Sequence, residues 1–215
     1  MTLYFISGLG ADRRIFEKLS LSSQHKIVFI DWIVPIKNET IQNYALRLSA
    51  NINTAEPFSI IGLSFGGMIA TEIAKFLTPK KTILISSISS HTQRPTALTI
   101  LKILPLYNFI PKRVLQIKNS FVFNMMGITN KKEQLLFSNM LIDTNITFFR
   151  WAIKSILHWE QPETVNNLYH IHGSADLMFP LKYLKPQHVI KNGKHLMIYT
   201  QATEVSTILS EIIDN

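Results

Sequence analysis

Short apolar segments alternate with amphipathic segments along the first ninety residues. Runs rich in Ile, Val and Phe at 3–7, 26–31 and 58–63 have the length and composition of buried strands. At 41–52 the apolar residues recur at helical spacing instead, with Asn38 as the expected N-terminal cap. Strands that alternate with helices in this way predict β-α-β units and a parallel sheet.

Helical spacing also appears at 15–19, where Asp12 is the expected cap, and at 66–77. A fourth apolar run at 82–85 predicts a further strand of the same sheet. Each of these segments continues the alternation of the first three strands. We therefore expect four parallel strands before residue 90.

The pattern changes at 91–160, which has no strand alternation and is typical of several short helices. Strand character resumes at 169–172 and 188–190, and an amphipathic helix closes the chain. These features predict an α/β fold with a mostly parallel sheet of about six strands and helices on both faces. We expect residues 1–90 and 161–215 to form the core, interrupted by a small helical cap at 91–160.

The composition supports one globular domain. Of 215 residues, 47% are apolar and 17% are charged, which lies outside the range of disordered chains. The absence of cysteine excludes disulfides, thiolate metal sites and a cysteine nucleophile. We expect a cytoplasmic protein, because the N-terminus lacks the pattern of a signal peptide and no apolar run has the length of a membrane span.

The net charge of +8 is unevenly distributed along the chain. Residues 91–160 carry a net charge of +6, and the rest of the chain carries +2. Nucleic acid is an unfavoured partner, because the sequence has no known nucleic-acid-binding motif. The basic segment instead suggests an apolar or acidic substrate, peripheral contact with an anionic membrane, or a solvated basic face.

One short motif has the pattern of a nucleophilic serine. Gly62-Leu63-Ser64-Phe65-Gly66 lies between a predicted strand and a predicted helix, the setting in which G-x-S-x-G forms a sharp turn that presents the serine hydroxyl. A purely structural turn with an incidental serine is the alternative. A serine nucleophile needs an imidazole to accept its proton and a carboxylate to orient that imidazole.

His195 and Asp176 are the candidates for these two roles. His195 follows the last predicted strand, and Asp176 follows the strand before it, so both belong at the carboxyl edge of the sheet. Asp12 and Asp31 are rivals for the acid, although Asp12 is expected to cap a helix and Asp31 precedes the serine in the chain. A solvated loop aspartate is the alternative for Asp176.

Two further histidines alternate on one predicted strand. His170 and His172 have the spacing of a metal-binding pair, but no third ligand is near them in the sequence. We expect a structural role for both. Of the others, His188 is expected within the last strand and His91 near the pocket, whereas His25 and His158 have no supporting pattern.

The order serine, acid, histidine resembles that of the α/β-hydrolase family. The segments Gly-Leu-Ser-Phe-Gly-Gly at 62–67, His-Gly-Ser-Ala-Asp at 172–176 and Gly-Lys-His at 193–195 are similar to its nucleophile elbow, acid loop and histidine loop. Ser-Gly-Leu-Gly at 7–10 is similar to its oxyanion loop, with serine where histidine is usual. The chain lacks the family's two initial antiparallel strands, which implies a trimmed version of the fold.

The resemblance implies a serine esterase or thioesterase that forms an acyl-enzyme on Ser64, with His195 as base and Asp176 as its partner. The backbone N–H groups of Leu9 and Phe65 would form the oxyanion hole. This chemistry requires neither a cofactor nor a metal. An acyltransferase and a non-catalytic ligand-binding protein are the alternatives, and an aspartate nucleophile is disfavoured because residue 64 is serine.

The resemblance also implies that the inserted segment forms the wall of an acyl pocket. Its apolar residues would then face a small acyl substrate. Packing of the same residues onto the sheet is the alternative. The residues concerned are Leu98, Ile100, Leu101, Ile103, Leu104, Leu106, Phe109, Ile110, Phe121, Phe123, Met125, Met126, Phe148, Phe149 and Trp151.

Overall fold

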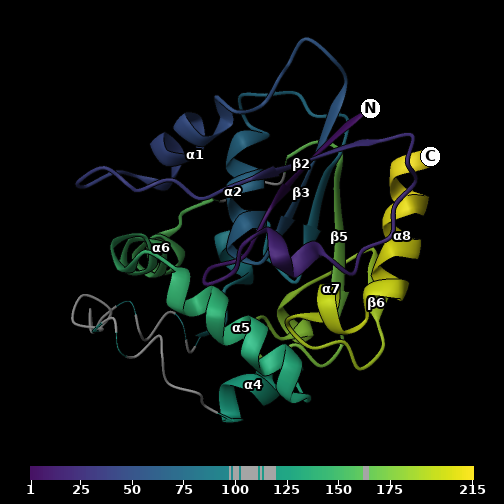
Figure 1. Ribbon diagram of the computed structural model, residues 1–215. Coiled ribbons are helices and arrows are strands. Elements are labelled where there is room, and N and C mark those ends of the chain that lie inside the picture. The colour runs from purple at the N-terminus through teal and green to yellow at the C-terminus, as the bar shows by residue number, and fades with distance from the viewer. Residues whose placement is uncertain (97, 99–101, 103–110, 112, 114–119, 162–164) are drawn as a thin grey trace.

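The computed structural model contains one six-stranded sheet with the strand order β2-β1-β3-β4-β5-β6 (Figure 1). It describes residues 1–96, 98, 102, 111, 113, 120–161 and 165–215. All five strand pairings are parallel. The strands are β1 (Thr2–Ile6), β2 (Lys26–Ile30), β3 (Phe58–Leu63), β4 (Thr82–Ile85), β5 (Leu168–Gly173) and β6 (His188–Ile190). The predicted α/β fold with six strands is confirmed, and each predicted strand matches to within one residue at either end.

Helices cover both faces of this sheet. Alternate residues of β1 show why, because Leu3 and Phe5 pack into one buried cluster and Tyr4 and Ile6 into another. On the Tyr4 side lie α1 (Ile41–Ser49), α2 (Phe65–Ile73) and α6 (Ile146–His158). On the Leu3 side lie the 3₁₀ helix η1 (Arg13–Phe16) and the helices α4 (Ser120–Met126), α5 (Lys131–Asp143), α7 (Met197–Thr200) and α8 (Ala202–Asp214). Short 3₁₀ turns η2 (His91–Gln93) and η5 (Leu181–Tyr183) lie in the connections.

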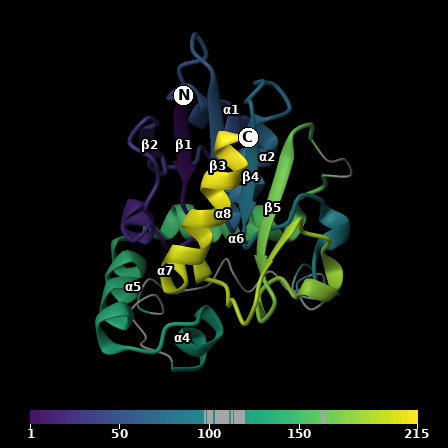
Figure 2. The same ribbon diagram turned by 90° about the vertical axis from the view of Figure 1, so that its right-hand side faces the viewer.

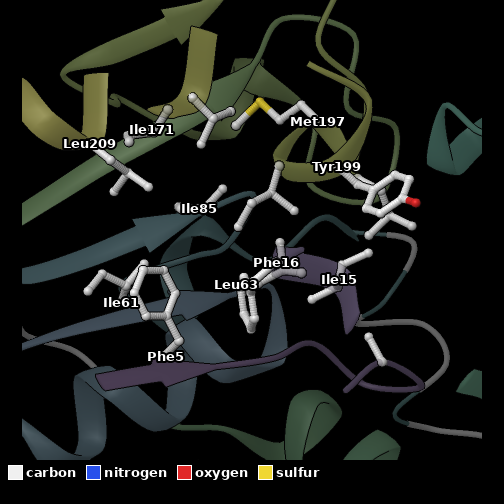
Figure 3. Close-up of a cluster of buried hydrophobic side chains, with 14 of the residues drawn as sticks. Phe5, Ile15, Phe16, Ile61, Leu63, Ile85, Ile171, Met197, Tyr199 and Leu209 are labelled. Carbon is white, nitrogen blue, oxygen red and sulfur yellow. The ribbon is translucent and has the colours of Figure 1, made fainter. Parts of the chain in front are cut away.

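Figure 3 shows part of the cluster on the Leu3 side. Phe5, Leu63, Ile85 and Ile171, from four neighbouring strands, point toward side chains of η1, α7 and α8. Burial of these large apolar side chains between sheet and helices contributes about 1.5–3 kcal/mol each. The cluster therefore fixes the positions of the loops that join these elements.

The segment predicted to form the cap contains helices α4, α5 and α6. Figures 1 and 2 show α4 and α5 beyond the carboxyl ends of the strands. The α4 end is joined to the loop after β6 by a hydrogen bond from the Leu196 N–H to the Met126 carbonyl at 3.0 Å. Helix α6 packs over α1, where the Trp151 indole N–H donates to the Glu39 carbonyl at 2.9 Å. The division into a core and a cap stays a prediction.

Two of the three anions of this segment pair with cations outside it, which leaves most of its described cations without an anion of the same segment. Glu133, Asp143 and Glu160 form ion pairs with Lys18, Arg14 and Lys102 respectively. Contact of this surface with a membrane stays a prediction. Within the described residues no helix has the length and apolar character needed to cross a bilayer. Nine residues predicted to contribute to the apolar wall or the basic charge lie outside the described residues: Ile100, Leu101, Ile103, Leu104, Leu106, Phe109, Ile110, Lys112 and Lys118.

Four predicted helix features differ from the structure. Helix α1 ends at Ser49, three residues earlier than its apolar pattern. The segment at 15–19 forms only the short η1, although Asp12 does cap it by accepting from the Arg14 N–H at 3.0 Å. Helix α2 ends at Ile73, four residues earlier than its apolar pattern. Helix α1 is capped by Thr40, and Asn38 lies before it with φ 59°. Asparagine tolerates this left-handed conformation, which accounts for its position in the turn.

Thr40→Ala should reduce the free energy of unfolding by about 1 kcal/mol. The Thr40 hydroxyl accepts from the Asn43 N–H at 3.2 Å, and alanine would leave that donor without its cap. Asn38→Gly should change stability little, because glycine also adopts positive φ. Urea denaturation of both variants measures the two effects. Equal stability of Thr40→Ala and the wild type would contradict the assignment of the cap.

Candidate active site

Ser64 occupies a sharp turn between β3 and α2. Its backbone has φ 51° and ψ −118°, an unusual conformation for a residue with a side chain. The Ser64 N–H donates to the Ile85 carbonyl at 2.9 Å, and the Ser64 carbonyl accepts from the Ser87 hydroxyl at 2.6 Å. The turn leaves Ser64 partly exposed while both of its neighbours are buried. This arrangement presents the hydroxyl at the carboxyl edge of the sheet.

The two glycines of the G-x-S-x-G motif are required by close backbone approaches. A Cβ atom on Gly66 would collide with the carbonyl oxygens of Ile6 and Ser7 at the end of β1. A Cβ atom on Gly62 would lie 2.5 Å from the Cα atom of Gly67. The turn therefore lets α2 begin in direct contact with the neighbouring strand.

The structure brings Ser64, His195 and Asp176 into one hydrogen-bonded chain. The His195 Nε2 atom lies 2.9 Å from the Ser64 Oγ atom, and its Nδ1 atom lies 2.8 Å from the Asp176 Oδ2 atom. Because an ionised carboxylate only accepts hydrogen bonds, Nδ1 must hold the proton of a neutral ring. The lone pair of Nε2 then faces the serine hydroxyl, as a general base requires.

Asp176 is buried and fully engaged. It is 2% exposed, and its Oδ1 atom accepts from the N–H groups of Met178 at 2.8 Å and Phe179 at 3.0 Å. Burial alone would raise the pKa of this carboxyl, but the charge and hydrogen bond of His195, together with His172 and the Phe179 N–H, hold the pKa below its usual range. Asp176 is therefore an anion at neutral pH.

The loops that position the acid and the base touch each other. A Cβ atom on Gly173 would lie 3.0 Å from the Cα atom of Gly193, and the Ala175 N–H donates to the Gly193 carbonyl at 2.9 Å. From the other side, the Lys194 ammonium donates to the Asn124 side-chain oxygen of α4 at 2.7 Å. His195 is consequently 4% exposed and held between the sheet and α4.

The loop after β1 lies beside Ser64. A Cβ atom on Gly8 would be 3.3 Å from the Ser64 Cβ atom. The Ser7 hydroxyl donates to the Ala11 carbonyl at 2.8 Å, so serine anchors this loop where the α/β-hydrolase family usually has histidine. Among the described residues, the N–H groups of Leu9 and Phe65 have no hydrogen-bond partner. Phe65 is also the first residue of α2, whose N-terminus carries partial positive charge.

The rival acids are engaged elsewhere. Asp12 caps η1 and pairs with Arg14, and Asp31 pairs with Arg13. Both line a pocket beside the loop after β1 rather than contacting His195.

Four other histidines make structural contacts, and His188 lies in β6 as predicted. His91 lies with its Nδ1 atom 2.8 Å from the Gln161 carbonyl, and His25 pairs with Asp214. His170 and His172 contact each other rather than a third ligand, and the described part of the chain contains no cluster of three residues able to bind a metal ion. The spacing that suggested a metal pair therefore belongs to a packed pair of rings.

A pocket of about 280 Å³ lies next to the loop after β1. Its wall combines Ser7 and Ala11 with Trp32, Ile33 and Val34, which follow β2, and with residues at the α5–α6 junction. Its charged members are three aspartates, each paired with Arg13 or Arg14: Asp12, Asp31 and Asp143. Trp32 and its neighbours were not among the predicted site residues, although their place directly after a parallel strand is a signal that could have identified them.

Phe65 joins this pocket to Ser64. Its ring lies 5.5 Å from that of Trp32, 6.3 Å from that of Phe148 and 5.9 Å from that of Trp151, measured between centroids. Phe148 and Trp151 therefore pack onto the body of the protein, as the packing alternative expects. Phe148 also lines the pocket, so this residue of α6 belongs both to the buried core and to the pocket wall.

The lowered pKa of Asp176 predicts a pH-dependent contribution to stability. The unfolded carboxyl has a pKa of about 3.9, so the contribution is present above that pH and is lost as the pH falls through the lower folded pKa. The stability difference between the wild type and Asp176→Asn should therefore shrink on acidification from about pH 7 to about pH 3. Chemical denaturation across this range measures it. A constant difference would contradict the lowered pKa.

No protein-family model and no curated protein matches the sequence. Among solved structures, MenH from S. aureus has a TM-score of 0.72 at 16% identity, covering 100% of this chain and 93% of that chain. A lipase-esterase related protein from Clostridium acetobutylicum has a TM-score of 0.71 at 16% identity, covering 98% and 93%.

A third similar structure extends the range of these neighbours. The enol-lactonase from Burkholderia xenovorans has a TM-score of 0.69 at 12% identity, covering 100% of this chain and 91% of that chain. The likeness thus spans nearly the whole length of each chain, and it includes the sheet and both helical layers. The chain therefore has the α/β-hydrolase fold.

Proposed function

We propose that this protein is a serine hydrolase that cleaves a carboxylic ester or thioester through an acyl-enzyme on Ser64. The observation that supports the proposal best is the hydrogen-bonded chain from the Ser64 hydroxyl through His195 to Asp176. The lipase-esterase related protein and the enol-lactonase among the similar structures are consistent with a hydrolase. Because these proteins are only 12–16% identical to this chain, the substrate is inferred from the chemistry of the site.

The first half of the reaction forms the acyl-enzyme. The Ser64 Oγ atom attacks the acyl carbonyl carbon as its proton passes to the His195 Nε2 atom. The carbonyl π electrons move onto oxygen, and the N–H groups of Leu9 and Phe65 stabilise this oxyanion. When the intermediate collapses, the bond to the leaving group breaks, and the departing alcohol or thiol takes the proton from His195. Asp176 stabilises the imidazolium throughout.

The second half returns the enzyme to its starting state. Water loses a proton to His195 and attacks the acyl carbon, and the collapse releases the acid and reprotonates Ser64. An acyltransferase with these three residues would use an alcohol or thiol in place of water. Product analysis with and without an added acceptor alcohol separates the two outcomes.

We propose that the 280 Å³ pocket receives an apolar part of the substrate. Ser7 in its wall adjoins Gly8, which lies against Ser64, and Trp32 and Phe148 in its wall pack on Phe65. The charged groups in the wall are three carboxylates, each paired with Arg13 or Arg14, and none of the wall residues is a cation that would bind an anion. Of the apolar and acidic substrates suggested by the sequence, the apolar one fits this pocket better.

Ser64→Ala should abolish labelling by a fluorophosphonate probe and lower kcat by about 10⁶-fold. Alanine removes the attacking oxygen and leaves the fold unchanged. Ser59→Ala, a buried serine on the same strand remote from the site, is the matched control and should label like the wild type. Absence of labelling in the wild type would favour a non-catalytic ligand-binding protein, and labelling of Ser64→Ala would exclude Ser64 as nucleophile.

Val34→Trp should narrow the pocket and lower kcat/KM by about tenfold or more for esters with a long acyl or alcohol part. Val34 lines the pocket and is 59% exposed, so tryptophan is tolerated by the fold. Ile36→Trp, on the same loop and 57% exposed but outside the pocket wall, is the control. The measurement is kcat/KM across ester series of increasing length. An equal effect of both variants would argue against this pocket.

A further inference from the structure

Two buried histidines lie behind the acid of the proposed triad and have no part in the mechanism above. His170 is 3% exposed and His172 is fully buried, and both belong to β5. Their rings lie 5.0 Å apart between centroids, with the planes at 83°. Neutral imidazoles have strong hydrogen-bonding groups, so their complete burial requires specific partners.

His172 contacts both ends of the acid loop. Its Nε2 atom lies 2.8 Å from the Phe179 carbonyl oxygen and 3.5 Å from the Asp176 Oδ2 atom. The Phe179 N–H in turn donates to the Asp176 Oδ1 atom at 3.0 Å. His172 therefore holds Phe179, whose N–H in turn holds the Asp176 carboxylate. The His172 Nε2 atom also lies near Asp176 Oδ2, the oxygen that is hydrogen-bonded to His195.

The partners determine which nitrogen holds the proton in each ring. A carbonyl oxygen only accepts, so the His172 Nε2 atom must donate to Phe179. In a neutral ring the Nδ1 atom is then an acceptor, and it lies 3.1 Å from the His170 Nε2 atom. The His170 Nε2 atom is placed to donate to it, and the Ser87 backbone is a second hydrogen-bond partner of the His170 ring. The result is a directed chain from His170 through His172 to the acid loop.

Both rings are neutral in this chain. Burial lowers the pKa of His172, and it lowers the pKa of His170 to about 3. The titratable groups that face His172 are His170 on the same strand, Asp176 in the acid loop and His195 in the loop after β6. Because His172 is neutral, it does not neutralise the negative charge of Asp176, which remains available to stabilise a charged His195 ring.

We propose that His172 is a positioning residue for Asp176, and that His170 fixes the tautomer in which His172 does so. The proposal rests on the proposed function for its kinetic consequences. In the other tautomer, the bare Nε2 atom of His172 would face the Phe179 carbonyl and the Asp176 carboxylate, which are both acceptors. The Phe179 carbonyl would lose its buried donor, and the acid loop would have to move away from His195.

The tautomers can be tested without any activity. In ¹⁵N NMR spectra of the imidazole rings, His172 should be protonated at Nε2 and bare at Nδ1 at neutral pH, and His170 should stay neutral down to about pH 5. His195 should hold its proton at Nδ1. A His172 ring protonated at Nδ1, or charged at neutral pH, would overturn the proposal even if the protein proved not to be a hydrolase.

Kinetics of two near-isosteric variants test the positioning role. His172→Gln keeps an N–H donor close to the position of Nε2, whereas His172→Met removes it. His172→Met should lower kcat by about 10²-fold with a small change in KM, the size expected when a reacting group is misplaced by about 1 Å. His172→Gln should recover most of the rate.

Tyr169→Phe provides the control on the same strand. The Tyr169 ring lies over the Lys81 ammonium, away from the acid loop, so this variant should keep the wild-type rate and pH profile. A His172→Met rate within twofold of the wild type would overturn the proposal. If the wild type does not react with the fluorophosphonate probe, the proposed function fails, and the NMR tautomers still decide the hydrogen-bonded chain.

Discussion

The turn at Ser64 is the constraint on which the candidate site depends. A residue with a side chain in this backbone conformation costs about 1–3 kcal/mol, and it persists because the surrounding structure imposes it. The Ile85 carbonyl and the Ser87 hydroxyl hold the two sides of the Ser64 peptide units, and β1 lies directly against Gly66. Packing of the sheet thus maintains the exposure of one hydroxyl at the start of a helix.

Parallel topology explains how residues so distant in sequence meet. Ser64 and His195 are 131 residues apart in the sequence. Ser64 directly follows β3, and His195 lies in the loop after β6. In a parallel sheet the carboxyl ends of all strands share one edge. The order β3-β4-β5-β6 then places Ser64, Asp176 and His195 along a single row. Helices α4 and α5 lie beyond the same edge, and α4 holds the last of these loops through hydrogen bonds with Lys194 and Leu196 (Figure 2).

Much of this arrangement could be predicted from the sequence. The six strands and the three residues that meet at the site follow from local patterns, namely apolar runs and loops that come directly after them. The features that could not be predicted depend on distant partners. Thr40 and Asn38 are both acceptable caps by type, and only the backbone conformation separates them. The contact of Trp32 with Phe148 joins segments more than a hundred residues apart and has no periodic signature.

The contact between Gly173 and Gly193 has a consequence for engineering. Because the two loops meet backbone to backbone and share the hydrogen bond from Ala175, neither can change length or sequence at this point without displacing the other. Transplanting one of them from another protein of the same fold would disrupt the acid–base pair even if the incoming loop were itself well folded. The two loops are therefore a single exchangeable unit and have to be grafted together.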